Sequence, residues 1–329
     1  MFPELRDRPV FICGHPKSGT SLLRALLDGH PQLVVYPEES VFFRRFLPRA
    51  KDAGLEEQLL LAEEYLIHIF TWNQTAPPAS QAGFPDRDYS AISFEAVRDE
   101  MRDLLSIHPP RHTGDILSAA VFSFGKVTSQ MSESTKIWVE KSPYNEHYSA
   151  RIFDWWPQAR CIHLVRDPRD NHLSYRRKHP DWRPEFFARN WVRSTQAGLD
   201  NRARFGEDSY LILRYEDLVQ SPEDVLRSVC SYMDIDFEAE LTTPVRAGES
   251  WRGNSMFDQD FAAISTSPVG RWRQQLDPSD ADVIEAMAAP QMRILDYQCP
   301  EKFSPQALLR AYTWPLRRLF NASTKGTHH

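Results

Sequence analysis

Short apolar runs rich in β-branched residues alternate with longer amphipathic stretches along most of this 329-residue chain. The short runs are typical of buried strands, whereas apolar residues that recur every three or four positions are typical of helices. The predicted strands are 10–13, 33–35, 136–139, 160–165 and 210–213, and the main predicted helices are 20–27, 55–70, 94–106, 116–131, 185–204 and 223–233. This alternation predicts one α/β domain whose parallel sheet is covered by helices on both faces.

Two long segments carry no periodic pattern. Residues 72–89 are rich in proline, and 247–268 are rich in glycine, serine and asparagine. Long loops often line binding sites, so we expect 72–89 to form a lid over one. Near the C-terminus, 308–320 is basic and amphipathic. We therefore assign residues 1–300 to one domain and 301–324 to a tail that packs on it, with peripheral membrane contact of the tail as the alternative.

Composition narrows the classes of partner. With 41% hydrophobic and 26% charged residues, the chain is typical of a globular protein, and its net charge of −6 argues against a nucleic-acid partner. The four cysteines are far apart and show no metal-ligand spacing, so we expect reduced thiols and no metal site. A charged N-terminal segment leads directly into the first strand, which predicts a cytoplasmic protein without a leader peptide or membrane span. The oligomeric state stays open.

The first predicted strand leads into a glycine-bounded loop, residues 14–19, and then into a helix that begins at Thr20. Such a loop directs backbone N–H groups toward the positive end of the helix dipole, where a phosphate or another tetrahedral anion is stabilised. Lys17 adds a full positive charge. In nucleotide triphosphatases the lysine directly follows the second glycine, whereas here Thr20 holds that position. An ordinary turn between strand and helix is the alternative.

A second candidate anion site follows the strand 160–165. Arg166 stands at the end of this strand, and Ser174 lies eight residues later in the next predicted helix. A guanidinium fork and a hydroxyl group can together satisfy the oxygens of a desolvated phosphate dianion. The alternative is an arginine that caps the edge of the sheet and a serine that bonds to its own helix.

Both motifs resemble those of the sulfotransferases that use 3'-phosphoadenosine 5'-phosphosulfate (PAPS). Residues 16–21, Pro-Lys-Ser-Gly-Thr-Ser, resemble the 5'-phosphosulfate loop of that family, and 165–175 resemble its 3'-phosphate motif. The resemblance spans residues 10–276 and implies a P-loop-type sheet, PAPS as cosubstrate, 3',5'-ADP as product and no metal. The residues that it implies for cofactor binding are Lys17, Ser18, Gly19, Thr20, Ser21, Arg166, Ser174, Tyr215, Gly270, Arg271 and Trp272, the last three in a loop similar to that of bacterial members.

The resemblance also implies catalytic residues. Lys17 would stabilise the leaving phosphate, and Lys141, which follows a different strand, would reach the sulfuryl oxygens. Between them these two lysines would neutralise the charge that develops during transfer.

The base needs a separate argument. Cytosolic members of the family have a catalytic histidine at the position that Pro143 occupies here. Glu38-Glu39 is similar to the Glu-Glu element of the tyrosylprotein sulfotransferases, so we expect Glu39 to be the base, with Glu38 second and His147 third. A pair of solvated turn residues is the alternative for the two glutamates.

On this interpretation the acceptor is a hydroxyl group of a carbohydrate, lipid, small metabolite or tyrosyl residue. Arg44 and Arg45 closely follow the Glu-Glu element and favour an acceptor with negative charge near its hydroxyl, although a solvated helix face explains them equally well. Two other functions stay open. A nucleotide-dependent kinase is disfavoured by Thr20 in the lysine position, and a non-catalytic 3'-phosphonucleotide-binding protein is disfavoured by the intact Lys17, Glu39 and Lys141.

Overall fold

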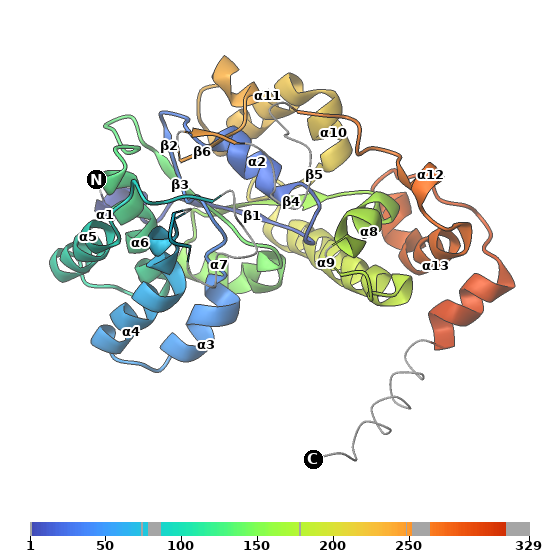
Figure 1. The fold of residues 1–329 in the computed structure, drawn as a ribbon, viewed down its shortest axis with the longest axis horizontal. Helices are drawn as coiled ribbons and strands as arrows, with labels where there is room; N and C mark the ends of the chain where they lie inside the picture. Colours follow the sequence, from blue (N-terminus) through green and yellow to red (C-terminus); the bar gives the residue numbers. More distant parts are fainter. Residues whose placement is uncertain are drawn as a thin grey trace, which may run out of the picture.

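A five-stranded parallel sheet runs through the centre of the molecule (Figure 1). The computed structural model describes residues 2–73, 75–77, 87–177, 179–247, 249–251 and 264–313. The strands are β1 (Pro9–Cys13), β2 (Leu33–Val35), β3 (Ile137–Lys141), β4 (Arg160–Val165) and β5 (Tyr210–Arg214), in the order β2-β3-β1-β4-β5. Neighbouring strands are parallel throughout, which confirms the predicted fold class.

Helices cover both faces of this sheet. They are α1 (Phe2–Leu5), α2 (Thr20–Leu27), α3 (Leu47–Ala50), α4 (Leu55–Ala62), α5 (Phe94–Ile107), α6 (Gly114–Val127), α7 (Ser149–Trp155), α8 (Pro168–Arg176), α9 (Pro184–Phe205), α10 (Tyr215–Gln220), α11 (Pro222–Met233), α12 (Trp272–Gln275) and α13 (Pro278–Ile294). Figure 1 shows α2, α10 and α11 on one face and α6, α7 and α9 on the other. Shorter elements are η1 (Phe42–Phe46), η2 (Glu63–Ile67), η3 (His68–Thr71), η5 (Asn145–Tyr148), η6 (Ala239–Thr242) and the ribbon of β6 (Val245–Arg246) with β7 (Glu249–Ser250).

Successive residues of a strand enter two different cores. In β1, Val10 and Ile12 pack with Leu23 and the other leucines of α2, whereas Phe11 and Cys13 face an aromatic cluster on the opposite side. Side chains alternate across a strand, and a parallel sheet with helices on both faces buries both sets. The packing therefore fixes which face of the sheet each strand residue occupies.

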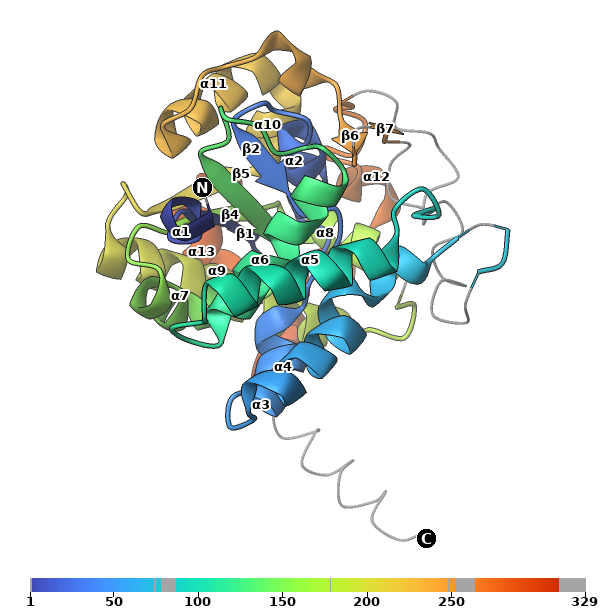
Figure 2. The same cartoon turned by 90° about the vertical axis from the view of Figure 1, so that its left-hand side faces the viewer.

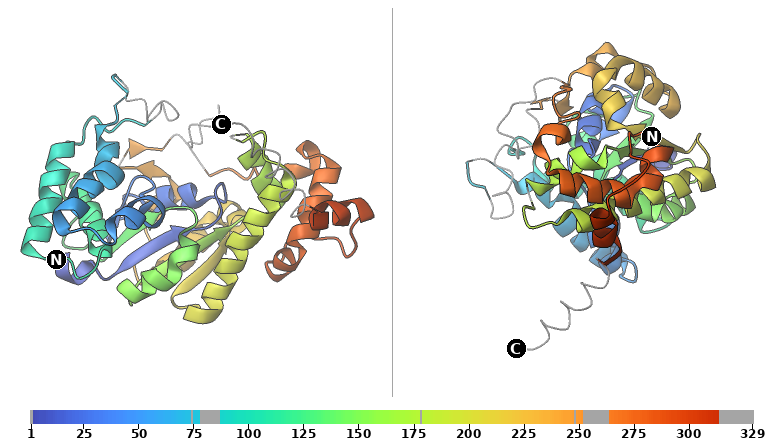
Figure 3. Two further views of the ribbon diagram at one scale, coloured as in Figure 1. Left: turned by 90° about the horizontal axis from the view of Figure 1, so that it is seen from below. Right: turned by 90° about the vertical axis from the view of Figure 1, so that its right-hand side faces the viewer.

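Additional helices extend the molecule beyond both edges of the sheet. Figure 2 shows α5 crossing in front of α6, with α3 and α4 below them. α4 contacts α6, and α3 contacts α4. At the opposite end α13 packs on α9 (Figure 3). Trp191, Ala288 and Met292 belong to one buried apolar cluster there. Because α13 also contacts α8, it supports the helix that carries Ser174.

The predicted helix 55–70 differs from the observed structure. α4 ends at Ala62 and continues as the π-helical η2 and the 3-10 segment η3. Leu66, Ile67, Ile69 and Phe70 are all buried, which is a wider apolar face than a regular α-helix presents. Changing the helical pitch lets these neighbouring side chains reach the core together.

Other boundaries differ by a few residues. The predicted helix 116–131 ends at Val127, because Ser129 has φ 58° and the chain turns back there. The predicted strand 136–139 extends to Lys141. Of the two predicted loops, residues 74, 78–86, 248 and 252–263 lie outside the described residues, so the expected lid is described only at its ends.

The predicted tail, 301–324, is described as far as residue 313. Residues 305–313 form a helix whose Arg310 contacts Glu185 of α9 at 2.9 Å and Asp280 of α13 at 3.1 Å. This part of the tail thus lies against the domain. Among the helices of the described residues, none combines the length and the apolar character that a membrane span requires.

Candidate functional site

The loops that follow all five strands surround one cavity of about 830 Å³ at the carboxyl edge of the sheet. From β1 the chain passes to β2 and β3 on one side and then to β4 and β5 on the other, so the strand order reverses at β1. Parallel α/β sheets bind their ligands at such a point. The volume is typical of a site for a small molecule or cofactor.

The glycine loop, residues 14–19, joins β1 to α2 beside this cavity. Gly14 has φ 130°, and a Cβ atom there would lie 2.2 Å from the carbonyl oxygen of Leu164. Gly19 has φ 100°, and its Cβ atom would lie 2.5 Å from Cδ2 of Tyr215. Lys17 adopts a left-handed conformation between them, with φ 68°. The loop therefore requires glycine at both ends, for conformation and for space.

Most of the predicted loop residues face the cavity. Lys17, Gly19, Thr20 and Ser21 line it. Ser18 is fully buried instead, and its Oγ has no hydrogen-bond partner within the described part of the chain. The first N–H groups of a helix have no carbonyl partner in that helix. Thr20 and Ser21, at the start of α2, therefore offer both N–H and hydroxyl donors to an anion.

Two distant side chains hold the glycine loop in place. The Gly14 N–H donates to Oε2 of Glu146 at 3.0 Å. Asn171 of α8 contacts Nδ1 of His15 through Oδ1 at 2.9 Å and donates through Nδ2 to the carbonyl oxygen of Pro16 at 3.2 Å. Burial raises the pKa of Glu146 to about 7 and lowers the pKa of His15 to about 4. His15 is therefore a neutral part of the scaffold at pH 7.

Arg166 connects the glycine loop to Ser174. Its Nη1 donates to Ser174 Oγ at 3.0 Å and to the carbonyl oxygen of Lys17 at 3.2 Å, and its Nη2 donates to the carbonyl oxygen of Pro268 at 3.0 Å. The guanidinium carbon lies 4.5 Å from the centre of the Tyr215 ring. The eight-residue spacing thus brings the predicted arginine and serine into direct contact.

A second guanidinium lies beside the first. Nη2 of Arg271 is 3.5 Å from Ser174 Oγ, and burial, followed by the charge of Arg166, lowers the pKa of Arg271. The Nε atoms of both arginines are buried and lack hydrogen-bond partners within the described residues. Like charges that share one hydroxyl in a partly desolvated corner are unfavourable without an anion. This corner is therefore suited to a phosphate dianion.

Helix α8 sets the position of Arg271. Asp170 accepts hydrogen bonds from the backbone N–H groups of Gly270 at 2.6 Å and Trp272 at 2.8 Å, which brings Arg271 to Ser174. Among the described residues that line the cavity, Arg271 is present, whereas Gly270 and Trp272 are not. Their backbone N–H groups hold Arg271 in place through Asp170, and a cofactor contact of Gly270 and Trp272 stays a prediction.

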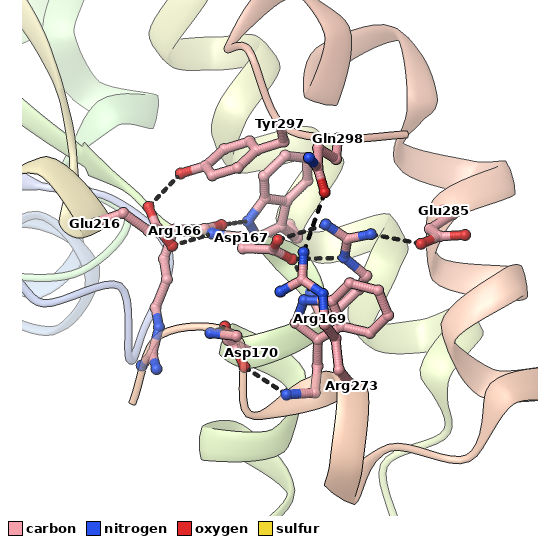
Figure 4. A network of polar contacts seen from close by, with 12 residues as sticks. Arg166, Asp167, Arg169, Asp170, Glu216, Arg273, Glu285, Tyr297 and Gln298 are labelled. Atoms are coloured by element: carbon pink, nitrogen blue, oxygen red, sulfur yellow. Dashed lines mark hydrogen bonds and ion pairs between the residues drawn. The ribbon is translucent and has the colours of Figure 1, made fainter. Parts of the chain in front are cut away.

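The turn that carries Arg166 is fixed by a separate polar network (Figure 4). The Asp167 N–H donates to Oε1 of Glu216 at 2.9 Å, and the hydroxyl of Tyr297 donates to Oε2 of the same carboxylate at 2.8 Å. Arg169 pairs with Asp167 at 2.6 Å and with Glu285 of α13 at 2.5 Å. These contacts leave Arg166 free of acidic partners within the described residues, while its backbone is held firmly.

Lys141 and Glu39 form an ion pair next to the first turn of α2. Nζ of Lys141 lies 2.7 Å from Oε1 of Glu39 and donates to Oγ of Ser21 at 3.1 Å. Lys141 is buried, whereas 41% of the Glu39 side chain is exposed, and Glu39 lines the cavity. Burial would raise the pKa of Glu39, but Lys141, with smaller effects from Arg87 and Arg44, lowers it overall. Glu39 is thus a carboxylate at neutral pH and can accept a proton.

The two other candidate bases have different surroundings. Oε1 of Glu38 accepts a hydrogen bond from the hydroxyl of Tyr89 at 2.6 Å and lies 3.0 Å from Nε of Arg87 and 4.0 Å from Nε of Arg246. This carboxylate therefore holds the ends of the segments that carry Arg87 and Arg246. His147 is not among the described residues that line the cavity, and burial lowers its pKa. The geometry favours Glu39 over both.

Aromatic and cationic side chains surround the rest of the cavity. They include Arg44, Arg45, Tyr65, His68, Trp72, Arg87, Tyr144, Tyr175 and His179. The guanidinium of Arg44 lies over the ring of Tyr144, 5.2 Å from its centre. The sequence reasoning missed Tyr144 and Tyr175, because isolated tyrosines have no characteristic spacing. The position of Tyr144, three residues after Lys141 at the same strand end, is the signal that could have identified it.

A buried cluster beneath the glycine loop was also missed. Donor atoms of Cys13, Glu146 and His163 lie within 4.8 Å of one another. Cys13 and His163 are partners in the register of β1 and β4, so only the sheet brings them together. Glu146 already accepts hydrogen bonds from Gly14 N–H and from the hydroxyl of Ser194. We therefore assign the cluster to support of the loop.

The chain is similar in sequence to known sulfotransferases. The model of the sulfotransferase family matches residues 9–239. Omega-hydroxy-beta-dihydromenaquinone-9 sulfotransferase Stf3 of Mycobacterium tuberculosis (strain CDC 1551 / Oshkosh) is 26% identical over 265 residues, which cover 72% of this chain and 66% of the relative. Protein-tyrosine sulfotransferase of Drosophila melanogaster is 21% identical over 89% of this chain and 52% of the relative. The chain thus spans less than two thirds of the length of either relative.

A solved structure supports the same fold. The sulfotransferase domain from the Synechococcus PCC 7002 olefin synthase superposes with a TM-score of 0.57 at 24% identity, and the match covers 89% of this chain and 96% of that domain.

Proposed function

Because this chain belongs to the sulfotransferase family, we propose that it transfers the sulfuryl group of PAPS to a hydroxyl group of an acceptor and releases 3',5'-ADP. The corner of Arg166, Arg271 and Ser174 carries the proposal. It borders the same cavity as the glycine loop, so a nucleotide with phosphates on both the 3' and 5' positions can contact both. ATP has no 3'-phosphate and would leave the two guanidinium groups without an anion.

The glycine loop would hold the 5' end of PAPS. Lys17, Thr20 and Ser21 offer a charge, hydroxyl groups and backbone N–H groups there. Tyr215, which lies against both Gly19 and Arg166, would contact the adenosine between the two phosphate sites.

In the transfer step, the acceptor oxygen forms a bond to sulfur while the bond between sulfur and the bridging oxygen of the 5'-phosphate breaks. Lys17 stabilises the charge on that bridging oxygen, and Lys141 stabilises the sulfuryl oxygens. Glu39 takes the proton of the acceptor hydroxyl. Its low pKa makes it a weak base, so the proton moves late, when the attacking oxygen has already become acidic.

The acceptor would bind in the aromatic and cationic half of the cavity. The names of the two relatives point to a hydroxylated menaquinone and to a protein tyrosine, so they do not indicate one acceptor. Arg44 and Arg45 lie next to the proposed base in sequence and line the same cavity. We therefore expect an acceptor that carries negative charge near its hydroxyl group.

Nucleotide binding and turnover test the proposal together. We expect 3',5'-ADP to raise the melting temperature far more than ADP, because a ligand at 100 times its Kd stabilises the folded state by about 2.7 kcal/mol. Labelled PAPS should then transfer its sulfuryl group to at least one acceptor in a panel of phenols, sugars and hydroxylated lipids. A preference for ATP with Mg²⁺ would favour a kinase. Binding of 3',5'-ADP without transfer would favour a non-catalytic nucleotide-binding protein.

A further inference from the structure

Glu140 directly precedes Lys141 in β3 and has no solvent-exposed surface. Adjacent residues of a strand point to opposite faces, so Glu140 points away from the face that Lys141 occupies. It is not among the described residues that line the cavity. Burying a carboxylate is costly unless hydrogen bonds satisfy its oxygens. The partners of Glu140 therefore indicate what the residue does.

Four hydrogen bonds reach this carboxylate. Oε1 accepts from the Ser40 N–H at 3.2 Å, from Ser40 Oγ at 2.6 Å and from Ser142 Oγ at 2.5 Å, and Oε2 accepts from Nδ2 of Asn145 at 2.8 Å. Ser40 immediately follows Glu39. Glu140 thus joins the segment of the proposed base to the strand that carries Lys141.

The same network holds the next two residues. The Val41 N–H donates to Ser142 Oγ at 3.0 Å, and the Phe42 N–H donates to Ser40 Oγ at 3.2 Å. Val41 has φ 49°, a left-handed conformation that is strongly disfavoured for a β-branched side chain. Such strain costs about 1 to 3 kcal/mol and persists only where the surroundings enforce it. Here three successive backbone N–H groups, bonded directly or through hydroxyls to Glu140, enforce it.

We propose that Glu140 is a positioning residue that holds Glu39 against Lys141. The inference rests on the proposed function, because it gives Glu39 the role of base. Without the Glu140 carboxylate, Ser40 loses both of its bonds to β3 and Val41 is free to relax to a negative φ, so the segment that carries Glu39 is no longer held against Lys141. The proposed contacts with the nucleotide come from the glycine loop, from the ends of β4 and β5, from α8 and from Arg271 before α12, so they remain in place.

Glu216 offers a matched control. It too is a buried carboxylate that accepts the N–H of the residue after a proposed site residue, Asp167 after Arg166. Glu216 therefore supports the 3'-phosphate side, whereas Glu140 supports the base. Substitution of Glu216 should leave the surroundings of Glu39 unchanged.

The test measures the ionisation of Glu39 directly, by NMR of the full chain labelled with ¹³C at glutamate carboxyls, with Glu39→Gln to assign the signal. The charged groups that face Glu39 are Lys141, Arg87 and Arg44, and the first of them contributes most to its low pKa. In Glu140→Ala we expect this pKa to rise toward the ordinary value of 4.5. Affinity for 3',5'-ADP should stay within about threefold, and kcat should fall by roughly 10² if the base is displaced.

Glu140→Gln keeps an oxygen that accepts from Ser40, so it should restore most of the wild-type titration. If the alanine variant does not fold, Ser40→Ala removes the hydroxyl that bonds to Glu140 and should also raise the Glu39 pKa. An unchanged Glu39 pKa in a folded Glu140→Ala that binds 3',5'-ADP would overturn the inference. So would an equal change in Glu216→Gln, because it would indicate general loosening of the fold. If the wild type transfers no sulfuryl group while the Glu39 pKa still rises in Glu140→Ala, the proposed function fails and the structural coupling stands.

Discussion

Arg166 touches both halves of the proposed nucleotide site, and its substitution can separate them. Arg166→Ala removes charge-assisted hydrogen bonds to a 3'-phosphate, each worth about 1.5 to 3 kcal/mol. We expect affinity for 3',5'-ADP to fall roughly 10- to 150-fold per lost bond, with little change for 5'-AMP. Calorimetric titration of both nucleotides measures the difference.

The contacts of Arg166 with the protein define the contrary outcome. Its guanidinium also donates to the carbonyl oxygens of Lys17 and Pro268. Equal losses for the two nucleotides would mean that Arg166 acts mainly by holding the glycine loop. Arg271→Ala, which removes the second guanidinium but neither of these bonds, is the control.

Substitutions of the proposed base, Glu39, and of Lys141 beside it should differ in their kinetic effects. Glu39→Gln keeps the shape of the side chain but cannot take a proton, so we expect kcat to fall by roughly 10² to 10⁴ with 3',5'-ADP binding retained.

Lys141→Ala should lower kcat more than it weakens 3',5'-ADP binding, because the product carries no sulfuryl charge. Steady-state kinetics and calorimetry decide both. A fully active Glu39→Gln enzyme would transfer the role to Glu38.

At the scale of single residues, the sequence motifs pointed to Lys17, Arg166 and Ser174, and all three line one cavity in the structure. Their roles stay predictions. Arg271 could be named from the resemblance, but its contact with Ser174 depends on Asp170, a hundred residues earlier. Glu140 gave no signal at all, because a buried acid is recognised only by the donors that the fold brings to it.

Among the elements, the glycine loop depends on the space in front of Gly19. Gly19→Ala would strain the left-handed backbone and push against the Tyr215 ring. Gly206→Ala also strains a backbone of positive φ, 84°, but nothing lies within 4 Å of the added methyl group. Both should destabilise the protein by about 1 to 3 kcal/mol. Gly19→Ala alone should weaken 3',5'-ADP binding. Urea unfolding measures the stability of both variants, and titration measures their affinity for the nucleotide. Equal affinities would exclude a role for the Gly19–Tyr215 contact.

The short π-helix η1 presents Arg44 and Arg45 to the cavity while burying Phe42, Phe43 and Phe46. If the two arginines attract negative charge, acidic acceptors should react faster than neutral acceptors of the same shape, and Arg45→Ala should reduce that preference. A screen of matched acceptor pairs measures both. If acidic and neutral acceptors turn over equally, and Arg45→Ala changes neither rate, these arginines have no role in acceptor choice and belong to a solvated surface.

The regular elements were predictable because their apolar periodicity is local. The changes in pitch in η1 and η2 were not, since they arise from aromatic and aliphatic neighbours that must enter one core together. The left-handed conformations of Lys17, Val41 and Tyr144 were equally hidden. Such conformations are enforced by tertiary hydrogen bonds, which a sequence pattern does not contain.

Across the whole molecule, burial fixes the protonation of groups far from the surface. Burial lowers the pKa of His15 and His172 to about 4 and that of His163 to about 3. Between about pH 4 and 6.5 they are neutral in the folded protein but charged in the unfolded chain. The unfolded state then binds more protons, so the contribution of these groups to stability rises with pH.

Glu146 changes the pH dependence of stability in the opposite direction, and one substitution can measure its contribution separately. Burial raises its pKa from 4.5 to about 7, so between these values the folded protein keeps a proton that the unfolded chain has released, and stability falls as pH rises. Glu146→Gln is neutral throughout and still offers an acceptor to the Gly14 N–H. The stability of the wild type relative to this variant should therefore decline from pH 4.5 to 7 by on the order of 3 kcal/mol. Urea unfolding of both proteins across this range measures the decline, with His172→Gln as a control whose effect has the reverse sign between about pH 4 and 6.5. If the difference in stability between the two proteins does not change with pH, Glu146 ionises normally in the folded protein and accepts the Gly14 N–H as a carboxylate.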